Sequence, residues 1–141
     1  MQMTPDKKKN KLYIVVPCYN EEQVLGETSK RLKIKCENLI QKGQISKDSK
    51  IVFVDDGSKD RTWKMISELH EKDSLFSGVK LSRNRGHQNA LLAGLTMASE
   101  HADMAISMDA DLQDDINAVD QMIEKYYEGC DIVYGVRSAR E

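Results

Sequence analysis

The sequence predicts an α/β fold, in which a mainly parallel sheet lies between helices on both faces as in a Rossmann-like three-layer α/β/α domain. Short runs rich in β-branched residues alternate along the 141 residues with segments long enough for a helix, which is the pattern of βαβ units. Polar and charged residues follow each of these runs. In open parallel sheets, ligands bind at the carboxyl ends of the strands, so we expect a ligand site at that edge.

Five strands and four helices are expected, in alternating order. The strands are expected at Leu12–Val16, Lys50–Val54, Gly78–Ser82, Met104–Met108 and Asp131–Gly135. The helices are expected within the intervening segments Glu21–Lys42, Asp60–Lys72, His87–His101 and Asp115–Glu128, each long enough for a helix and its loops. This order favours a single domain over residues 12–141, because no repeat or low-complexity linker interrupts it.

The second and third helices have the clearest patterns. Asp60 can cap the second, and Trp63, Ile66 and Leu69 follow at spacings of three, which gives one buried stripe. We therefore expect Trp63 in the core rather than in a ligand site. The third, His87–His101, is apolar on most faces and rich in small residues, which predicts close packing against the sheet.

Composition excludes several classes of protein. Hydrophobic residues make up 40% and charged residues 31% of the chain, as in soluble globular proteins rather than disordered ones. The net charge of -2 provides no field that would bind nucleic acid. A basic run at Lys7–Lys11 lies in a polar arm of residues 1–11, which we expect to be flexible and solvated; the alternative is contact with an anionic membrane surface.

Cysteine number and hydropathy predict a cytoplasmic chain. The three cysteines Cys18, Cys36 and Cys130 are far apart and odd in number, which fits neither a disulfide framework nor a zinc site. No apolar stretch approaches the ~18 residues of a membrane span, and no signal-peptide core follows the N-terminus.

Two carboxylates end the second expected strand, in the stretch VDDGSKDRT. Asp55 and Asp56 are followed by Gly57, which allows a turn. Turn and cap chemistry accounts for one of the acids in this stretch. We therefore predict that Asp55 or Asp56 accepts hydrogen bonds from a base edge or a ribose, with a plain charged turn as the alternative.

A denser acidic stretch, DADLQDD, follows the fourth expected strand. Asp109 and Asp111 are two residues apart, so in an extended segment their side chains point to the same side, and Gln113 continues that row. Such oxygen ligands suit Mg²⁺ or Mn²⁺, and a bound cation would neutralise a diphosphate. The prediction is displacement of a nucleoside diphosphate; the alternative is a charged loop with Asp114 or Asp115 as a helix cap.

A basic loop, SRNRGHQ, follows the third expected strand. Arg83, Arg85 and His87 lie near Gly86 and could balance the charge of a ligand or fix a base. The alternative is a surface turn with a helix start at His87. His70 and His101 lie near helix C-terminal ends, where imidazole is favourable for the helix dipole, and we assign them no role.

Five stretches in order, VVPCYNEE, VDDGSKDRT, LSRNRGHQNALLAGL, MDADLQDD and YGVRSARE, resemble the inverting glycosyltransferases of family 2. The resemblance covers Leu12 to Glu141 and is strongest to dolichol-phosphate mannosyltransferases and bactoprenol-phosphate glucosyltransferases. It implies a GT-A fold, Mg²⁺ or Mn²⁺, a UDP- or GDP-hexose donor and a polyprenyl phosphate acceptor. It also implies a full-length protein at the cytoplasmic face of the membrane, with membrane contact only through a region beyond residue 141.

The resemblance also implies roles for individual residues. Tyr19 would lie near the base, Asp55 or Asp56 would hold the base, and Arg137 would approach the phosphate or the acceptor. Asp111 would ligate the metal, and no residue stands out as the catalytic base. The implied nucleotide-sugar set is Pro17, Tyr19, Asn20, Glu21, Val54, Asp55, Asp56, Arg83, Asp109, Ala110, Asp111 and Arg137, and the implied metal set is Asp109, Asp111 and Gln113.

The sequence departs from the family pattern in two respects. Arg85 stands where many relatives have an aromatic residue, and family members continue well past residue 141 into the acceptor region. The chain therefore resembles a donor-binding half, and the alternative to a transferase is a nucleotide-binding piece without activity of its own. A phosphohydrolase would carry its D-x-D after the first strand rather than the fourth. An oxidoreductase would need G-x-G-x-x-G where PCYNEE stands.

Overall fold

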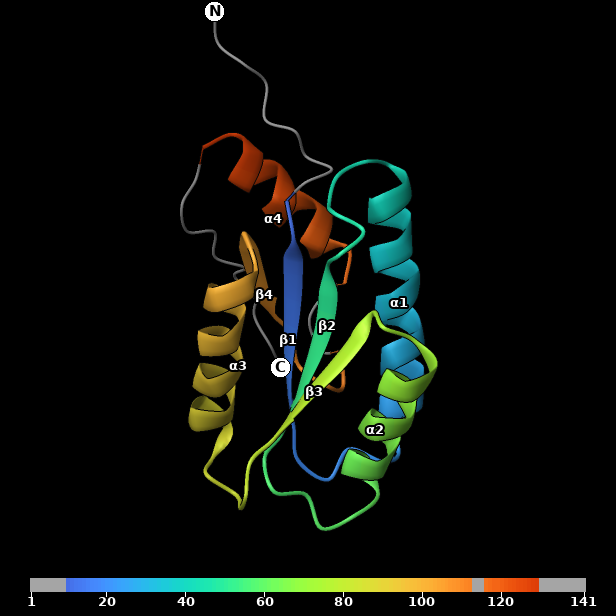
Figure 1. The fold of residues 1–141 in the computed structure, drawn as a ribbon, viewed down its shortest axis with the longest axis vertical. Helices are drawn as coiled ribbons and strands as arrows, with labels where there is room; N and C mark the ends of the chain where they lie inside the picture. The colour runs from blue at the N-terminus through green and yellow to red at the C-terminus, as the bar shows by residue number, and fades with distance from the viewer. Residues whose placement is uncertain (1–9, 113–115, 130–141) are drawn as a thin grey trace, which may run out of the picture.

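The computed structural model describes residues 10–112 and 116–129. Within these residues, four parallel strands form one sheet in the order β3-β2-β1-β4 (Figure 1). The strands are β1 (Leu12–Cys18), β2 (Lys50–Asp55), β3 (Phe76–Lys80) and β4 (Met104–Ser107). The chain order reverses between β1 and β4, and ligands bind at such switch points in open α/β sheets.

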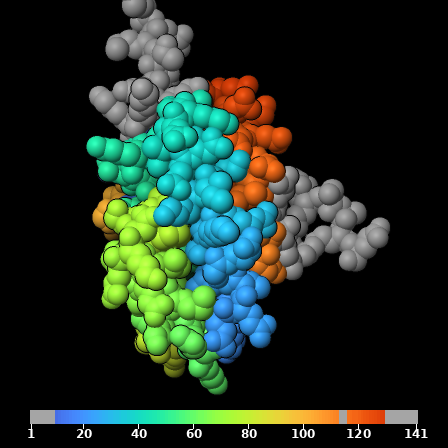
Figure 2. Space-filling view, turned by 90° about the vertical axis from the view of Figure 1, so that its right-hand side faces the viewer, coloured from blue at the N-terminus to red at the C-terminus, as the bar shows by residue number. Residues whose placement is uncertain are grey.

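Helices cover both faces of the sheet, so the predicted α/β layering is confirmed. One hydrophobic cluster joins the sheet to α1, α2 and α4, and a second joins the opposite face to α3 (Figure 1). Within the first layer α1 lies between α2 and α4 (Figure 2). The helices are α1 (Leu25–Gln41), α2 (Thr62–Lys72), α3 (His87–His101) and α4 (Ala118–Tyr127).

The central strand β1 is buried along its whole length. Leu12, Ile14 and Val16 belong to the cluster under α1, whereas Tyr13 and Val15 belong to the cluster under α3. This alternation follows the period of two of a strand. A strand covered on both faces needs a continuous apolar sequence, which is what the run LYIVV provides.

The prediction that α3 packs closely against the sheet is confirmed. Ala90, Gly94 and Ala98 form its buried side. A Cβ atom at Gly94 would lie 2.4 Å from Val15 Cγ1 and 2.8 Å from Val54 Cγ2. The helix therefore approaches the sheet through a position that has no room for a side chain.

Strand β3 begins two residues earlier than predicted, at Phe76. Phe76 is buried, pairs in register with Ile51 and stacks on Phe53 with 6.1 Å between ring centroids. Burial of these two stacked phenyl rings favours the observed start of β3 and its register.

Each of the four helices lies within its expected segment, and α3 spans the whole of its segment. In α2 the helix starts at Thr62 with Arg61 at the N-cap, so the placement of Asp60 as the cap is one residue off. Asp60 still accepts the Thr62 N–H at 2.9 Å. Trp63 packs against the core as expected but stays half-buried, with Lys80 Nζ 5.8 Å from its ring centroid.

Several predicted features lie outside the described residues. They are the fifth strand at Asp131–Gly135, most of the basic run at Lys7–Lys11, Cys130, the metal ligand Gln113, the possible caps Asp114 and Asp115, and Arg137. Within the described residues, none of the helices has the length and apolar character that crossing a membrane would require.

Candidate functional site

A pocket of about 210 Å³ opens at the carboxyl ends of β1 and β2, beside the start of α3. Four predicted site residues line it: Pro17, Tyr19, Glu21 and Asp56. The pocket therefore lies at the edge of the sheet where the sequence predicts a ligand site. Its other lining residues are Cys18, Asn84, Gly86, His87 and Ala90.

Asp56 joins two of the loops that form the pocket. Its side chain is buried, Oδ1 accepts the Arg85 N–H at 2.7 Å, and Oδ2 accepts the Gly86 N–H at 3.1 Å. A carboxylate has about four lone-pair sites, so each oxygen retains capacity for a further donor. Asp56 can therefore hold the β3–α3 loop and accept an N–H of a ligand at the same time.

Asp55 lies deeper and does not line the pocket. It is fully buried, and Oδ1 accepts the Ser58 N–H at 3.2 Å. Among the described residues Oδ2 has no hydrogen-bond partner. Burial together with the charges of Glu21 and Asp55 raises the pKa of the neighbouring Cys18 thiol well above its usual range, so Cys18 lines the pocket as a neutral group.

Gly57 allows the loops after β2 and β3 to touch. Its φ is +73°, and a Cβ atom there would lie 2.4 Å from Asn84 N and 2.5 Å from the carbonyl carbon of Arg83. Only glycine combines this backbone conformation with so close an approach. The predicted turn at Asp55–Gly57 therefore also packs against the loop after β3 and places Asn84 at the pocket.

Asn20 supports the β1–α1 loop instead of lining the pocket. It has a φ of 51°, its Oδ1 accepts the Lys59 N–H at 2.8 Å, and its own N–H donates to Ser58 Oγ at 2.9 Å. The Glu21 N–H donates to Thr62 Oγ1 at 2.8 Å. These bonds hold the loop ahead of α1, which starts at Leu25.

Two further predicted residues lie apart from the pocket. Val54 is fully buried in the cluster under α3, and Arg83 is exposed in the β3–α3 loop without lining the pocket. Tyr19, by contrast, lines the pocket and leaves 40% of its surface exposed. Its ring is thus available for stacking on a flat ligand group.

The acidic stretch after β4 forms a turn, so the expectation of an extended segment is wrong. Strand β4 ends at Ser107, the Leu112 N–H donates to Asp109 O at 3.0 Å, and Leu112 has a φ of 53°. Ala110 is buried, whereas Asp109 is half-buried and Asp111 is exposed. We call Asp109–Leu112 the acidic turn.

The acidic turn acts electrostatically on the β1–α1 loop. Partial burial raises the pKa of Glu21, and the charges of Asp111, Asp60 and Asp109 raise it further. The carboxylates of Glu21, Asp109 and Asp111, nearly ninety positions apart in sequence, therefore lie close together where the strand order reverses between β1 and β4. Such crowding is relieved when a proton or a cation binds.

The described residues fit a divalent cation in part. Asp109 and Asp111 supply carboxylate oxygens, the ligand type that Mg²⁺ and Mn²⁺ take. Within residues 10–112 and 116–129, no three histidine, cysteine or acidic side chains are grouped so that they could hold an ion. The third expected ligand, Gln113, lies outside these ranges.

Sequence reasoning missed Asn84 and Ala90 as pocket residues and named Cys18 only for its redox state. Asn84 lies four residues after the end of β3, in the loop SRNRGHQ, so its position after a strand was a usable signal. The role of Ala90 depends on how closely α3 approaches the sheet. No local pattern carries that information.

Comparison with curated proteins finds relatives of more than twice the length. The chain is 54% identical over 130 residues to the uncharacterized glycosyltransferase YkoT of Bacillus subtilis (strain 168), covering 92% of this chain and 39% of that protein. It is 36% identical over 140 residues to the undecaprenyl-phosphate 4-deoxy-4-formamido-L-arabinose transferase of Enterobacter sp. (strain 638), covering 99% and 40%. The chain thus spans about two fifths of these relatives.

Solved structures of glycosyltransferases share the fold. S. aureus TarS 1-349 in complex with UDP superposes with a TM-score of 0.59 at 21% identity, over 83% of this chain and 33% of that one. The mannosyltransferase PcManGT from Pyrobaculum calidifontis, in complex with GDP-Man and Mn²⁺, gives 0.55 at 24% identity, over 73% and 28%. The GT-A fold expected from the sequence is confirmed.

The sequence match places these similarities in one family. The glycosyl transferase family 2 domain matches residues 13–141, which include the pocket, the acidic turn and all four strands except the first residue of β1. The chain belongs to glycosyl transferase family 2.

Proposed function

We propose that this chain binds the nucleoside diphosphate of a UDP- or GDP-linked hexose together with Mg²⁺ or Mn²⁺, as the donor-binding part of an inverting hexosyltransferase. One observation carries the proposal: a pocket bounded by Tyr19 and Asp56 lies on the same edge of the sheet as the acidic turn. The pocket would take the base, and the acidic turn would meet the diphosphate.

The pocket has the features that a nucleobase requires. Tyr19 offers an exposed ring for stacking, and Asp56 lines the pocket and has spare acceptor capacity on its carboxylate. An N–H on the base edge would donate to that carboxylate. The known ligands of the structural neighbours, UDP in TarS and GDP-Man in PcManGT, support a nucleotide of either kind.

The acidic turn has the charge that a metal diphosphate requires. A cation held by Asp109 and Asp111 would neutralise the diphosphate and stabilise the charge on it as it leaves. Without a cation, these carboxylates would repel the ligand, and their effect on the pKa of Glu21 reflects how crowded the charges are. The Mn²⁺ in the PcManGT complex supports this assignment.

A polyprenyl phosphate is the acceptor that the relatives favour, because several are named undecaprenyl-phosphate transferases. A phosphate monoester has a second pKa of about 6, so its oxygen is ionised near neutral pH without a strong base. Positioning and charge neutralisation would then provide much of the catalysis. Such an acceptor implies that the complete protein works at the cytoplasmic face of a membrane.

A nucleotide-binding piece without transfer activity is the second candidate. The chain spans about two fifths of its curated relatives, and none of its described residues stands out as a base for the acceptor. This candidate predicts the same donor binding as the first and differs only in catalysis.

Titration calorimetry of the 141-residue chain with UDP and with GDP, each with and without Mn²⁺, tests the proposal. We expect one nucleotide to bind in a Mn²⁺-dependent manner and Asp111→Asn to remove that dependence. Asp48→Asn is the matched control, because Asp48 is also exposed but precedes β2, at the opposite end of the strand from the pocket.

Each outcome separates one possibility. Binding that is lost in Asp111→Asn and kept in Asp48→Asn supports the donor site and identifies the base. Equal loss in both variants would point to net charge alone and would contradict a metal site at the acidic turn. Absence of binding by a wild-type chain that unfolds cooperatively would refute the proposed donor function of this chain.

A further inference from the structure

Helix α1 contacts both segments that follow β4. Thr28 and Lys35 are seven residues apart in α1, close to two helical turns, so they lie on the same side of the helix. Thr28 bonds to the acidic turn and Lys35 bonds to the start of α4. Helix α1, which starts four residues after Glu21, therefore provides the side chains that hold the acidic turn and α4 in place.

Thr28 makes the contact nearest to the predicted metal ligands. Its side chain is 2% exposed, and Oγ1 donates to Ala110 O at 2.5 Å, at the short end of the range for such bonds. Ala110 stands between Asp109 and Asp111, so a bond that fixes its carbonyl constrains the backbone of both neighbours. Met108, just before the turn, is held to β1 by its N–H bond to Val15 O at 3.0 Å.

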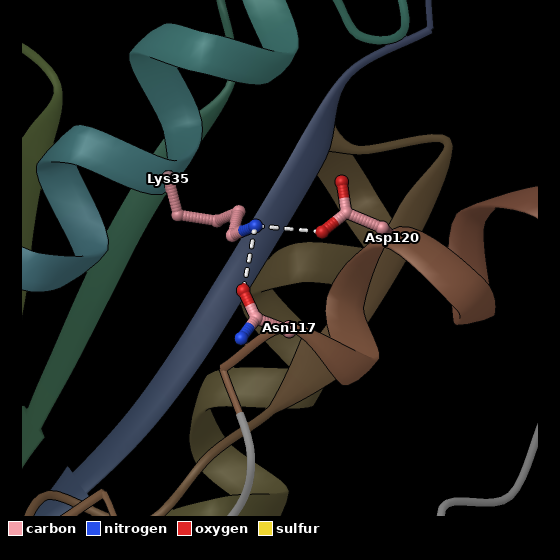
Figure 3. Close-up of polar contacts among 3 residues, drawn as sticks. All are labelled: Lys35, Asn117 and Asp120. Atoms are coloured by element: carbon pink, nitrogen blue, oxygen red, sulfur yellow. Dashed lines mark hydrogen bonds and ion pairs between the residues drawn. The ribbon is translucent and has the colours of Figure 1, made fainter.

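Lys35 makes a separate contact. Its Nζ lies 2.6 Å from Asp120 Oδ2 and 3.3 Å from Asn117 Oδ1 (Figure 3). The Lys35 side chain is 15% exposed, whereas the Asp120 side chain is 41% exposed, so water and salt partly screen the pair. Lys35 thus fixes α4 on α1 without touching the acidic turn, which makes it a useful reference for Thr28.

We propose that Thr28 is a positioning residue for donor binding: its hydroxyl holds the acidic turn at the distance from Glu21 and the pocket that a metal diphosphate requires. This inference rests on the proposed function, because it needs Asp109 and Asp111 to meet the cation. The simpler view is that the hydroxyl only satisfies a buried carbonyl and contributes to stability like any other buried hydrogen bond.

Three variants in α1 distinguish these views. Thr28→Val keeps the shape of the side chain and removes the hydroxyl, and Thr28→Ser keeps the hydroxyl. Ser29→Ala is the matched control: Ser29 is also buried, at 4% exposure, but it donates to Gly26 O within α1. Lys35→Met releases α4 and leaves the Thr28 bond intact.

The experiment measures nucleotide affinity with and without Mn²⁺ by calorimetry, and stability by thermal unfolding, for the 141-residue chain. We expect Thr28→Val to weaken Mn²⁺-dependent binding roughly tenfold. Removal of a group that orients a metal ligand by a hydrogen bond typically costs about this much affinity. Thr28→Ser should restore most of the affinity. Ser29→Ala and Lys35→Met should lower the melting temperature and leave the affinity ratio with and without Mn²⁺ unchanged.

Failure of this inference differs from failure of the donor function. If the wild type binds with Mn²⁺ and Thr28→Val binds equally well while melting earlier, Thr28 is only structural and the inference is overturned. If Ser29→Ala weakens binding as much as Thr28→Val does, the effect is general to α1 and the inference is again overturned. If the wild type does not bind either nucleotide, the donor function itself is refuted.

Discussion

Replacement of Gly57 by alanine should separate the two loops that form the pocket wall. The new Cβ atom would lie 2.4 Å from Asn84 N and 2.5 Å from the carbonyl carbon of Arg83, both main-chain atoms. Neither can rotate away as the end of a side chain could. One loop must therefore move, and the bonds from Asp56 to Arg85 and Gly86 move with it.

The cost has two parts. A left-handed backbone costs an alanine about 1 to 2 kcal/mol, and overpacking against a fixed neighbour costs about 1 to 3 kcal/mol. The sum of about 2 to 5 kcal/mol corresponds to a decrease in melting temperature of roughly 6 to 15 °C for a chain of this size. It approaches the whole stability of a weakly stable domain.

Urea and thermal unfolding of Gly57→Ala measure this loss, with Gly129→Ala as the control. Gly129 also has a positive φ, +104°, but a Cβ atom there would meet no heavy atom of the described residues within 4 Å, so we expect the backbone term alone. Gly57→Asn adds a second comparison, because asparagine tolerates the left-handed region but still brings a Cβ atom. We expect Gly57→Ala and Gly57→Asn to be well below Gly129→Ala in stability, with an unchanged urea slope.

Equal losses in Gly57→Ala and Gly129→Ala would refute the reasoning. That result would mean that the contact between the loops contributes nothing beyond backbone strain. A Gly57→Asn chain as stable as the wild type would contradict the close approach directly, because its Cβ atom meets the same main-chain atoms.

Three further predictions concern the scaffold. Gly94→Ala should lower the free energy of unfolding in urea by about 1 to 2 kcal/mol, because overlap of the new Cβ atom with Val15 outweighs the gain in helix propensity. A more stable variant would contradict the close approach of α3 to the sheet. Asp73→Asn should lower the melting temperature at pH 7, because the hydrogen bond from Lys33 lowers the pKa of Asp73 and thus stabilises the fold when Asp73 is ionised. The difference from the wild type should disappear as the pH falls through that lowered pKa. A difference that persists in acid would refute this prediction. Cys36, whose pKa burial raises to about 12, should resist iodoacetamide at pH 8 until denaturant is added; peptide mapping would detect alkylation of the native chain, which would contradict this burial.

The elements that were predicted best are those whose burial follows one simple period. The run LYIVV gives β1 and the small residues of His87–His101 give α3, and both occur as expected. Strand β3 starts earlier than the sequence predicts because the Phe76 ring stacks on Phe53 of β2. Such a partner lies some twenty residues away and leaves no trace in local alternation.

The site was predicted from strand ends, and its details depend on contacts between loops. Tyr19 and Asp56 line the pocket as expected, because residues after parallel strands meet at one edge. Asn20 has good chemistry for a ligand but supports Lys59 instead. The acidic turn was expected to be extended because spacing alone does not reveal a residue with positive φ such as Leu112.

The order β3-β2-β1-β4 has a consequence during synthesis on the ribosome. Strand β1 precedes the other described strands in the chain, and it pairs with β2 on one edge and with β4 on the other. At about 5 to 20 residues per second, the roughly fifty residues between the ends of β2 and β4 take about 3 to 10 s to emerge. Throughout that interval the nascent chain has its most apolar strand with one edge unpaired, and we expect this to be when it most needs a chaperone.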